Sequence, residues 1–263
     1  MVASSSALLR ALAMGAFVDT GVHMLSKDTS LARILRLPLA LVPPETELRI
    51  LRGPLRGRKW IAGAASHGCW LGTYEVDRLR AFADCIHPGA TVYDVGANVG
   101  IYSLLASVRV GPAGKVYAFE PLERNLGYLR RHMTLNRVQN CVVLDAAVSD
   151  SDALRRFSTK CWDFSMGRLS EQGDVEVATV TLDSCIYREK GLRPPDTIKI
   201  DVEGGELEVL QGATRTFTEF HPVVFLEVHG RQLHVDCCTF LVAKGYQVKE
   251  GYGQIRAVWR PTT

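Results

Sequence analysis

The chain has 263 residues, of which 47% are hydrophobic and 22% are charged, with a formal net charge of +3. This is the composition of a globular protein with one sizeable core, and the charge is too small to indicate nucleic-acid binding by itself. No apolar run reaches the roughly 18 residues that a membrane-spanning helix needs, so we expect no transmembrane segment.

The N-terminal segment and the cysteines give indications of the cellular compartment in which the protein is located. The seven cysteines are odd in number, scattered and without C-x-x-C spacing, which fits a reducing compartment better than a disulfide framework. We therefore expect a cytoplasmic protein. The alternative is an organelle (mitochondrial) location, because residues 1–18 contain no acid and include three serines, as a transit peptide does. A simple N-terminal helix explains the same residues.

Residues 1–71 precede the first predicted strand of the main sheet. We interpret them as an N-terminal helical appendage, for targeting or for shaping the substrate pocket, and residues 72–263 as the main domain. Residues 31–37 predict a short helix that Pro38 ends. Residues 52–59 form a basic, glycine-containing loop, R-G-P-L-R-G-R-K. Such a loop suits an acidic substrate or RNA phosphate, although short charge runs usually just face water.

From residue 73 onward, helix and strand patterns alternate, which favours an α/β fold with a doubly wound, mostly parallel sheet. Helices are expected over 73–86, with Thr73 as the N-cap, and over 101–107, 125–136, 204–220 and 231–244. Strands are expected over 91–93, 115–119, 141–144, 196–201 and 222–228. Residues 154–158 and 174–180 predict an antiparallel excursion, and 246–250 with 254–259 predict a terminal hairpin.

A glycine turn, D-V-G-A-N-V-G over Asp94–Gly100, joins the first of these strands to a helix. Such a turn brings backbone N–H groups and a helix N-terminus close to a ligand. It differs from the dinucleotide fingerprint G-x-G-x-x-G, and its carboxylate before the first glycine is a poor host for a pyrophosphate. A nucleoside with a cationic end and no phosphates suits it, and S-adenosyl-L-methionine is such a cofactor. A turn without a ligand is the alternative.

Polar residues also follow the second and third strands. Glu120 ends the second strand, where a carboxylate can accept hydrogen bonds from both ribose hydroxyls. Asp145 and Ala147 follow the third strand, where an adenine ring would lie on the backbone. Ligands of open α/β sheets bind outside the carboxyl ends of the strands, so these residues would meet at one site.

The fourth strand runs into Lys199, Asp201 and Glu203, and the fifth ends in Glu227 and His229. Methyl transfer depends on positioning, and an alcohol acceptor must also lose a proton. Asp201 and His229 are therefore the candidate general bases, with Lys199 on the same side of its strand as Asp201. A hydrogen-bonded structural histidine is the alternative for His229. Crowding of Asp201, Glu203 and Glu227 would raise one carboxyl pKa or hold a divalent cation.

Six segments together resemble the FkbM family of S-adenosylmethionine-dependent methyltransferases: Tyr74-Glu75, Asp94–Gly100, Phe119-Glu120-Pro121, Thr181-Leu182-Asp183, Ile198–Glu206 and Glu227-Val228-His229. The resemblance implies a class I methyltransferase fold, Rossmann-like, with seven strands in the order 3-2-1-4-5-7-6. It also implies O-methylation of a hydroxyl on a small molecule or glycan. The cofactor-binding residues that we predict are Glu75, Asp94, Gly96, Asn98, Gly100, Glu120, Asp145 and Ala147.

Two regions depart from the family pattern. Residues 1–71 have no counterpart in the family core, and residues 161–167 lie where the family usually has a more polar loop. Both would shape the acceptor pocket. An RNA methyltransferase and a non-catalytic cofactor-binding module stay open as alternatives, and an NAD-dependent oxidoreductase is the weakest. The sequence does not predict the acceptor or the oligomeric state.

Overall fold

The computed structural model describes residues 39, 41–159, 167–188, 191–251 and 253–260. The predicted transit segment 1–18, the predicted helix 31–37 and most of the loop 161–167 lie outside these residues. The chain divides into two compact units, Met1–Pro43 and Pro44–Thr263. All elements described below belong to the second unit. No helix in the described ranges is long and apolar enough to cross a membrane.

From residue 44 onward, the predicted appendage begins with strands rather than helices. Strands β1 (Glu47–Arg49) and β2 (Lys59–Ile61) pair antiparallel and precede the short helix α3 (His67–Leu71). A helical appendage is therefore not seen between residues 44 and 66. The functional boundary after residue 71 stays a prediction, and the compact unit itself begins at Pro44.

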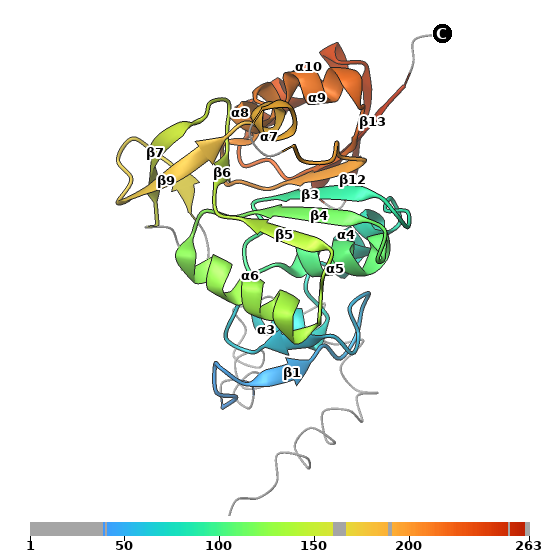
Figure 1. Cartoon of the computed structure of the whole chain (residues 1–263), viewed down its shortest axis with the longest axis vertical. Helices are drawn as coiled ribbons and strands as arrows, with labels where there is room; N and C mark the ends of the chain where they lie inside the picture. The colour runs from blue at the N-terminus through green and yellow to red at the C-terminus, as the bar shows by residue number, and fades with distance from the viewer. Residues whose placement is uncertain (1–38, 40, 160–166, 189–190, 252, 261–263) are drawn as a thin grey trace, which may run out of the picture. The chain divides into compact units, whose positions relative to one another are not determined.

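The main sheet has seven strands in the order β12-β13-β11-β10-β3-β4-β5 (Figure 1). Their bounds are Thr91–Val95 (β3), Lys115–Phe119 (β4), Cys141–Leu144 (β5), Thr197–Ile200 (β10), Val223–Leu226 (β11), Tyr246–Gly251 (β12) and Gln254–Trp259 (β13). The strands from β11 to β5 pair in parallel, whereas β13 pairs antiparallel with β11 and β12. Counted within this sheet, the order is the 3-2-1-4-5-7-6 that the resemblance implies. The sheet is mixed, because the terminal hairpin is antiparallel.

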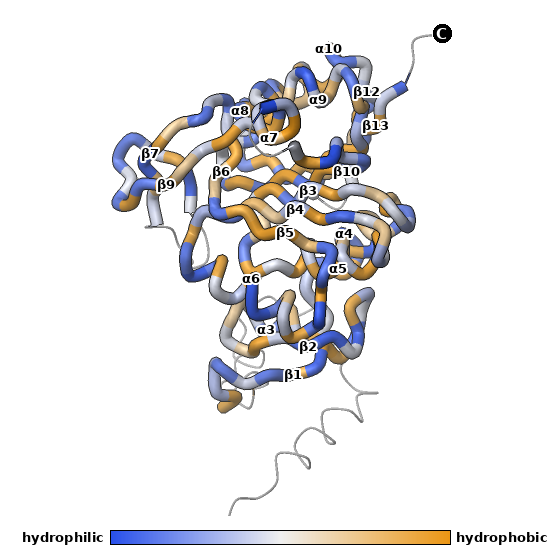
Figure 2. Tube along the Cα trace, in the orientation of Figure 1, coloured by the Kyte–Doolittle hydropathy of each residue, from blue (hydrophilic) through white to orange (hydrophobic). Residues whose placement is uncertain are grey.

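Helices cover both faces of this sheet (Figure 1). One face carries α4 (Val76–Ala83), α5 (Ile101–Val110) and α6 (Glu123–Leu135). The other carries α7 (Leu182–Tyr187), α8 (Glu206–Gln211), α9 (Thr214–Glu219) and α10 (Arg231–Ala243). Hydrophobic residues make up most of the central strands (Figure 2), and every residue of β3 and β10 is buried. Burial on both faces explains why these strands are mostly apolar, with Asp94 of β3 and Lys199 of β10 as buried charged exceptions.

The predicted antiparallel excursion is confirmed. Strands β7 (Ala153–Ser158) and β9 (Val175–Val180) pair antiparallel, and β6 (Ala147–Val148) and β8 (Arg168–Leu169) complete a small sheet. Phe157 and Val177 are buried in a small hydrophobic cluster that belongs to this sheet. The excursion leaves the main sheet after β5 and returns at α7.

The single helix predicted over 204–220 is wrong, because the structure has two helices, α8 and α9, with a break at Gly212. The Gly212 carbonyl accepts a hydrogen bond from the Asp183 N–H (3.0 Å). The Asp183 carboxylate accepts hydrogen bonds from the N–H groups of Arg215 (2.9 Å) and Thr216 (2.8 Å) in the first turn of α9. A side chain from α7 therefore caps a new helix start that the local sequence does not mark.

The predicted N-cap of the first helix is also wrong. Helix α4 begins at Val76, whereas the Thr73 N–H donates to the carbonyl of Gly68 in the first turn of α3. The residue before α4 is Glu75, whose left-handed backbone (φ 43°) is uncommon for a residue other than glycine. This conformation places the Glu75 side chain among the charged groups of the candidate site.

Candidate active site

The glycine turn, Gly96–Gly100, has three residues with left-handed backbone. The φ angles are 74° at Gly96, 50° at Asn98 and 93° at Gly100. A Cβ atom on Gly96 would overlap the carbonyl oxygen of Asp201, and one on Gly100 would overlap the Leu129 side chain. Both glycines are therefore required by close packing as well as by conformation.

The N–H groups of the glycine turn all donate to protein oxygens. The acceptors are the Phe119 carbonyl for Gly96 (3.1 Å) and Ala97 (2.9 Å), Glu120 Oε2 for Asn98 (2.8 Å), Asn98 Oδ1 for Val99 (2.7 Å) and the Ala97 carbonyl for Gly100 (2.9 Å). A pyrophosphate-binding turn must instead direct N–H groups at the phosphates. The geometry thus counts against a dinucleotide and against the oxidoreductase alternative.

Glu120, at the end of β4, is a buried carboxylate held by N–H donors. Its oxygens accept hydrogen bonds from the backbone of Asn98 (2.8 Å) and Leu122 (3.0 Å) and from the Asn125 side chain (3.2 Å). Burial raises the pKa of Glu120 to about 6, although these hydrogen bonds oppose the rise. The carboxylate is pre-oriented beside the glycine turn, where a carboxylate would meet ribose hydroxyls.

Asp94 lies in the interior rather than at the surface of the site. Its side chain has no exposed area, and it accepts a hydrogen bond from Ser103 Oγ (2.5 Å). Its other oxygen is 3.7 Å from Lys199 Nζ. Complete burial raises the pKa of Asp94, and the Lys199 ammonium opposes that rise. Because the side chain is fully enclosed, the geometry favours a supporting role for Asp94 behind the turn.

Lys199 connects the glycine turn to Asp201. Its Nζ donates to the Gly96 carbonyl (3.0 Å) and lies 3.4 Å from Asp201 Oδ2. Burial disfavours its charge, but the carboxylates of Asp201 and Asp94 outweigh burial and raise the pKa of Lys199. The Lys199 side chain is only 4% exposed.

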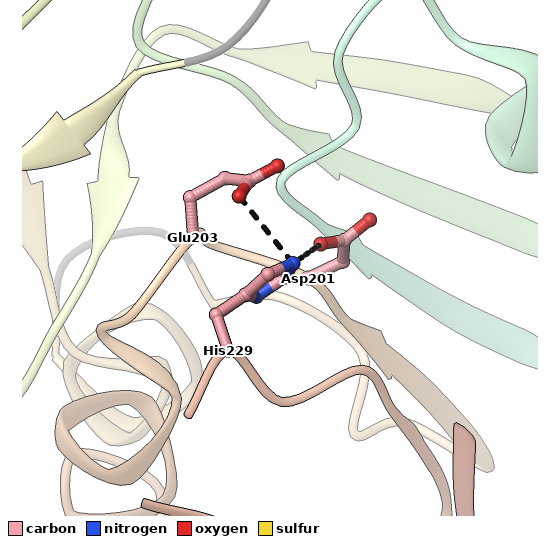
Figure 3. A group of neighbouring side chains, drawn as sticks. All are labelled: Asp201, Glu203 and His229. Atoms are coloured by element: carbon pink, nitrogen blue, oxygen red, sulfur yellow. Dashed lines mark ion pairs between the residues drawn. The ribbon is translucent and has the colours of Figure 1, made fainter. Parts of the chain in front are cut away.

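His229 lies among three carboxylates at the ends of β10 and β11. Its Nδ1 donates to Glu206 Oε1 (2.9 Å), while Nε2 lies 3.3 Å from Glu203 Oε2 and 3.9 Å from Asp201 Oδ1 (Figure 3). We call Asp201, Glu203, Glu206 and His229 the strand-end cluster. The hydrogen bond to Glu206, followed by the charges of Glu203 and Asp201, raises the pKa of His229 to about 9.

Glu227 does not join the strand-end cluster. Both of its oxygens accept from Arg78 Nη1 (3.0 and 2.8 Å), and one also accepts from Gln254 (3.3 Å). The same Arg78 nitrogen donates to Glu75 (2.9 Å), whose second oxygen accepts from the Tyr102 hydroxyl (2.8 Å). The structure therefore groups His229, rather than Glu227, with Asp201 and Glu203.

Sequence reasoning missed two residues of this site. Arg78 follows Glu75 by three positions on a predicted helix, a spacing at which side chains meet. The ion pair between them could therefore have been predicted from the sequence. Gln254 comes from the terminal hairpin, and nothing in the local sequence marks it. Of the predicted adenine contacts, Asp145 is exposed and Ala147 is buried in β6. Their contact with adenine stays a prediction.

The basic loop over residues 52–59 lies between β1 and β2. Arg56 and Arg58 are exposed, and Lys59 forms an ion pair with Glu47 (3.4 Å). Exposed arginines beside an exposed ion pair are typical of a solvated loop, so the geometry adds no support for RNA binding.

Comparisons with known proteins identify the family of the chain. The family model described as "Methyltransferase FkbM domain" matches residues 94–248. The chain is 30% identical over 159 residues to the 31-O-demethyl-FK506 methyltransferase FkbM of Streptomyces tacrolimicus, which covers 48% of this chain and 60% of that protein. It is 28% identical over 158 residues to the hexuronic acid methyltransferase AglP of Haloferax volcanii, covering 59% of this chain and 62% of that protein. The chain thus spans about three fifths of the length of these relatives.

Two further proteins are similar. The 2-O-methyltransferase NoeI of Sinorhizobium fredii is 27% identical over 167 residues, covering 56% of this chain and 66% of that protein. Among solved structures, methyltransferase FkbM from Methylobacillus flagellatus superposes with a TM-score of 0.48 at 16% identity, over 74% of this chain and 56% of that chain. The segment that the family model matches contains the glycine turn, Glu120 and the strand-end cluster.

Proposed function

The chain belongs to the FkbM family of S-adenosylmethionine-dependent methyltransferases, and we propose that it methylates a hydroxyl oxygen of a small-molecule or glycan acceptor. The observation that carries the proposal is the glycine turn, whose N–H groups are all used and which lies beside Glu120. A site rich in carboxylates and without free turn N–H groups fits a cofactor with ribose hydroxyls, an ammonium group and no phosphates.

The cofactor would be held by residues at the carboxyl ends of the strands. Glu120 would accept hydrogen bonds from the ribose, and Asp145 and Ala147 would border the adenine. Glu75, the residue before α4, would attract the ammonium group with its carboxylate. Gly96, Asn98 and Gly100 would give the turn its shape, and Asp94 would support it from the interior.

The proposed chemistry needs a positioned acceptor and a group that takes its proton. The cofactor supplies a methyl carbon on a sulfonium sulfur, which an acceptor oxygen attacks in line. Asp201 is the candidate general base, because its carboxylate is partly exposed at the end of β10. Lys199 would fix the orientation of Asp201 from the buried side. His229 has both nitrogens directed at carboxylates and would orient the strand-end cluster.

The names of the relatives support an oxygen acceptor. Two of them specify an O-methylated position, and a third names a hexuronic acid. The acidic cluster at the site does not favour a polyanion such as RNA, because like charges repel. We therefore propose an acceptor with several hydroxyl groups and little negative charge near the reacting oxygen.

Calorimetry with S-adenosylmethionine tests the site. We expect Glu120→Gln to weaken binding about 10- to 100-fold, because a hydrogen bond to a charged group contributes about 1.5–3 kcal/mol. Glu123→Gln is the matched control, since Glu123 is exposed and lies nearby on α6, and it should bind as wild type does. Equal affinity in both variants would contradict the proposed site.

Labelled-methyl transfer tests the reaction. The protein, the labelled cofactor and a metabolite or glycan extract are incubated, and products are identified by mass spectrometry. Label on an oxygen, lost in Asp201→Asn, is the expected result. Cofactor binding without transfer to any acceptor would instead indicate a non-catalytic module, and label on RNA would favour the RNA alternative.

A further inference from the structure

We propose that Asp201, Glu203 and His229 bind a divalent cation at the carboxyl ends of β10 and β11. One ligand atom from each residue lies within 4.8 Å of the others. Figure 3 shows the three side chains converging, two from the loop after β10 and one from the segment after β11. Glu203 reaches this position with a left-handed backbone (φ 58°), which is uncommon outside glycine.

A fourth residue, Glu206, provides the independent evidence. Its side chain is fully buried at the start of α8, and its Oε1 holds Nδ1 of His229 at 2.9 Å. Its Oε2 has no hydrogen-bond partner within the described residues. Histidines that bind metals usually donate their other ring N–H to a carboxylate in this way. Glu206 therefore fixes the imidazole with Nε2 directed at Glu203 and Asp201.

The charge and chemistry of the three ligands suit a divalent ion. Two carboxylates carry two negative charges, and one imidazole with two carboxylates is a ligand set for first-row divalent metals. The neighbouring ammonium of Lys199 engages Oδ2 of Asp201 (3.4 Å), whereas Oδ1 faces His229 (3.9 Å). Asp201 can thus contact Lys199 and the cation with different oxygens.

Three protein ligands leave further coordination positions open, as catalytic metal sites do. A cation here would lie next to the glycine turn, because the Asp201 carbonyl packs against Gly96. It would orient an oxygen of the acceptor beside the methyl donor. This use of the ion rests on the proposed methyl transfer, whereas the binding of the ion does not.

The binding test uses the full chain, freed of metal by a chelator and measured without cofactor or acceptor. Titration with Mn²⁺, followed by electron paramagnetic resonance, should show one bound ion per chain, with a nitrogen coupling from His229. Glu203→Gln and His229→Gln should each weaken binding at least tenfold, and His229→Gln should abolish the nitrogen coupling. Glu206→Gln should weaken binding about 10- to 100-fold, the usual effect of losing a carboxylate behind a ligating histidine.

Two controls carry the same chemical changes away from the site. Glu176→Gln alters an exposed residue of β9 and His234→Gln alters a histidine of α10, and both should bind Mn²⁺ as wild type does. No Mn²⁺ binding, or equal binding in all variants, would overturn the proposal and leave a salt-bridged cluster only. Thermal unfolding of each variant identifies any that fails to fold. The partly exposed Glu203 then remains the informative position.

Calorimetry with S-adenosylmethionine separates this proposal from the proposed function. If His229→Gln loses Mn²⁺ but binds the cofactor, both proposals stand. If the wild-type chain binds the cofactor but no Mn²⁺, only the cation site fails. If it binds Mn²⁺ but no cofactor, the cation site stands and the proposed function fails.

Discussion

Gly96 packs directly against the backbone carbonyl of Asp201, so closely that a Cβ atom on Gly96 would overlap that oxygen. Lys199 reinforces the contact, because its ammonium donates to the Gly96 carbonyl (3.0 Å) and lies 3.4 Å from the Asp201 carboxylate. The glycine turn and the strand-end cluster are therefore one packed unit. A substitution in the glycine turn should therefore change the position of Asp201, the candidate general base.

Replacing Gly96 by alanine should damage both stability and cofactor binding. The matched control is Gly57→Ala, because Gly57 also has a positive φ (85° against 74°) but nothing lies within 4 Å of its added Cβ. The control should lose about 1–2 kcal/mol from backbone strain alone. Gly96→Ala should lose a further 1–3 kcal/mol or so from overpacking and should bind S-adenosylmethionine weakly. Urea unfolding and calorimetry measure these effects, and equal losses in the two variants would contradict the packing argument.

Asp183→Asn should destabilise the chain by about 0.5–2 kcal/mol, the usual effect of losing a helix cap. The Asp183 carboxylate accepts from the N–H groups of Arg215 and Thr216 and from the Thr216 hydroxyl. Asparagine replaces one of these two acceptor oxygens with an NH₂ group, which can only donate. Urea unfolding provides the measurement. Asp236→Asn is the control, since Asp236 accepts from the Gln232 side chain within its own helix, α10. Equal stability of the two variants would show that the helix break does not depend on Asp183.

This cap also illustrates what the sequence predicts and what it does not. The strands, the glycine turn and the order of the helices follow from local patterns, because periodicity and turn residues act within a few positions. At the break near Gly212, the chain contacts Asp183, which is about thirty residues away in the sequence and meets this segment only in the folded chain. The local sequence also does not predict the start of α4, where Glu75 rather than Thr73 precedes the helix.

The candidate site shows a similar division. Asp201, Glu203 and His229 were identified because each follows a predicted parallel strand, and the carboxyl ends of such strands meet. Glu227 is not grouped with Asp201 and Glu203 because it binds Arg78 instead. Arg78 and Glu227 are far apart in the sequence, so local patterns do not predict this contact. The buried state of Asp94 is also a tertiary property, since Lys199 and Ser103 come from other elements.

The pair of Arg78 and Glu227 should be strongly coupled. A double-mutant cycle with Arg78→Met and Glu227→Gln should give a coupling free energy of about 1–3 kcal/mol, because the contact uses both carboxylate oxygens and is roughly four-fifths buried. Arg80 and Asp77 form the control pair on the same helix, and both are 63% exposed. Their coupling should stay below about 0.5 kcal/mol. Equal coupling in the two cycles, measured by urea unfolding, would show that burial does not strengthen the Arg78 contact.

His132 connects the β1–β2 hairpin to the glycine turn. Its Nε2 accepts from the Ile61 N–H (3.1 Å), its Nδ1 donates to the Val99 carbonyl (2.8 Å), and its ring stacks on Trp60 with centroids 3.8 Å apart. These contacts require the neutral imidazole, since Nε2 must keep its lone pair. Burial lowers the pKa of His132 to about 4.

Stability should therefore fall in mild acid through His132. The pKa is about 4 in the folded chain and about 6.5 in the unfolded chain, so the unfolded chain binds one more proton between these values. The contribution is complete above pH 6.5 or so and is lost as the pH falls toward 4, to a total of about 3 kcal/mol. Urea unfolding of the wild type and of His132→Gln across this range gives the difference between the two free energies of unfolding. That difference should shrink with falling pH, because glutamine does not titrate, whereas a constant difference would show that His132 is not held neutral by the fold.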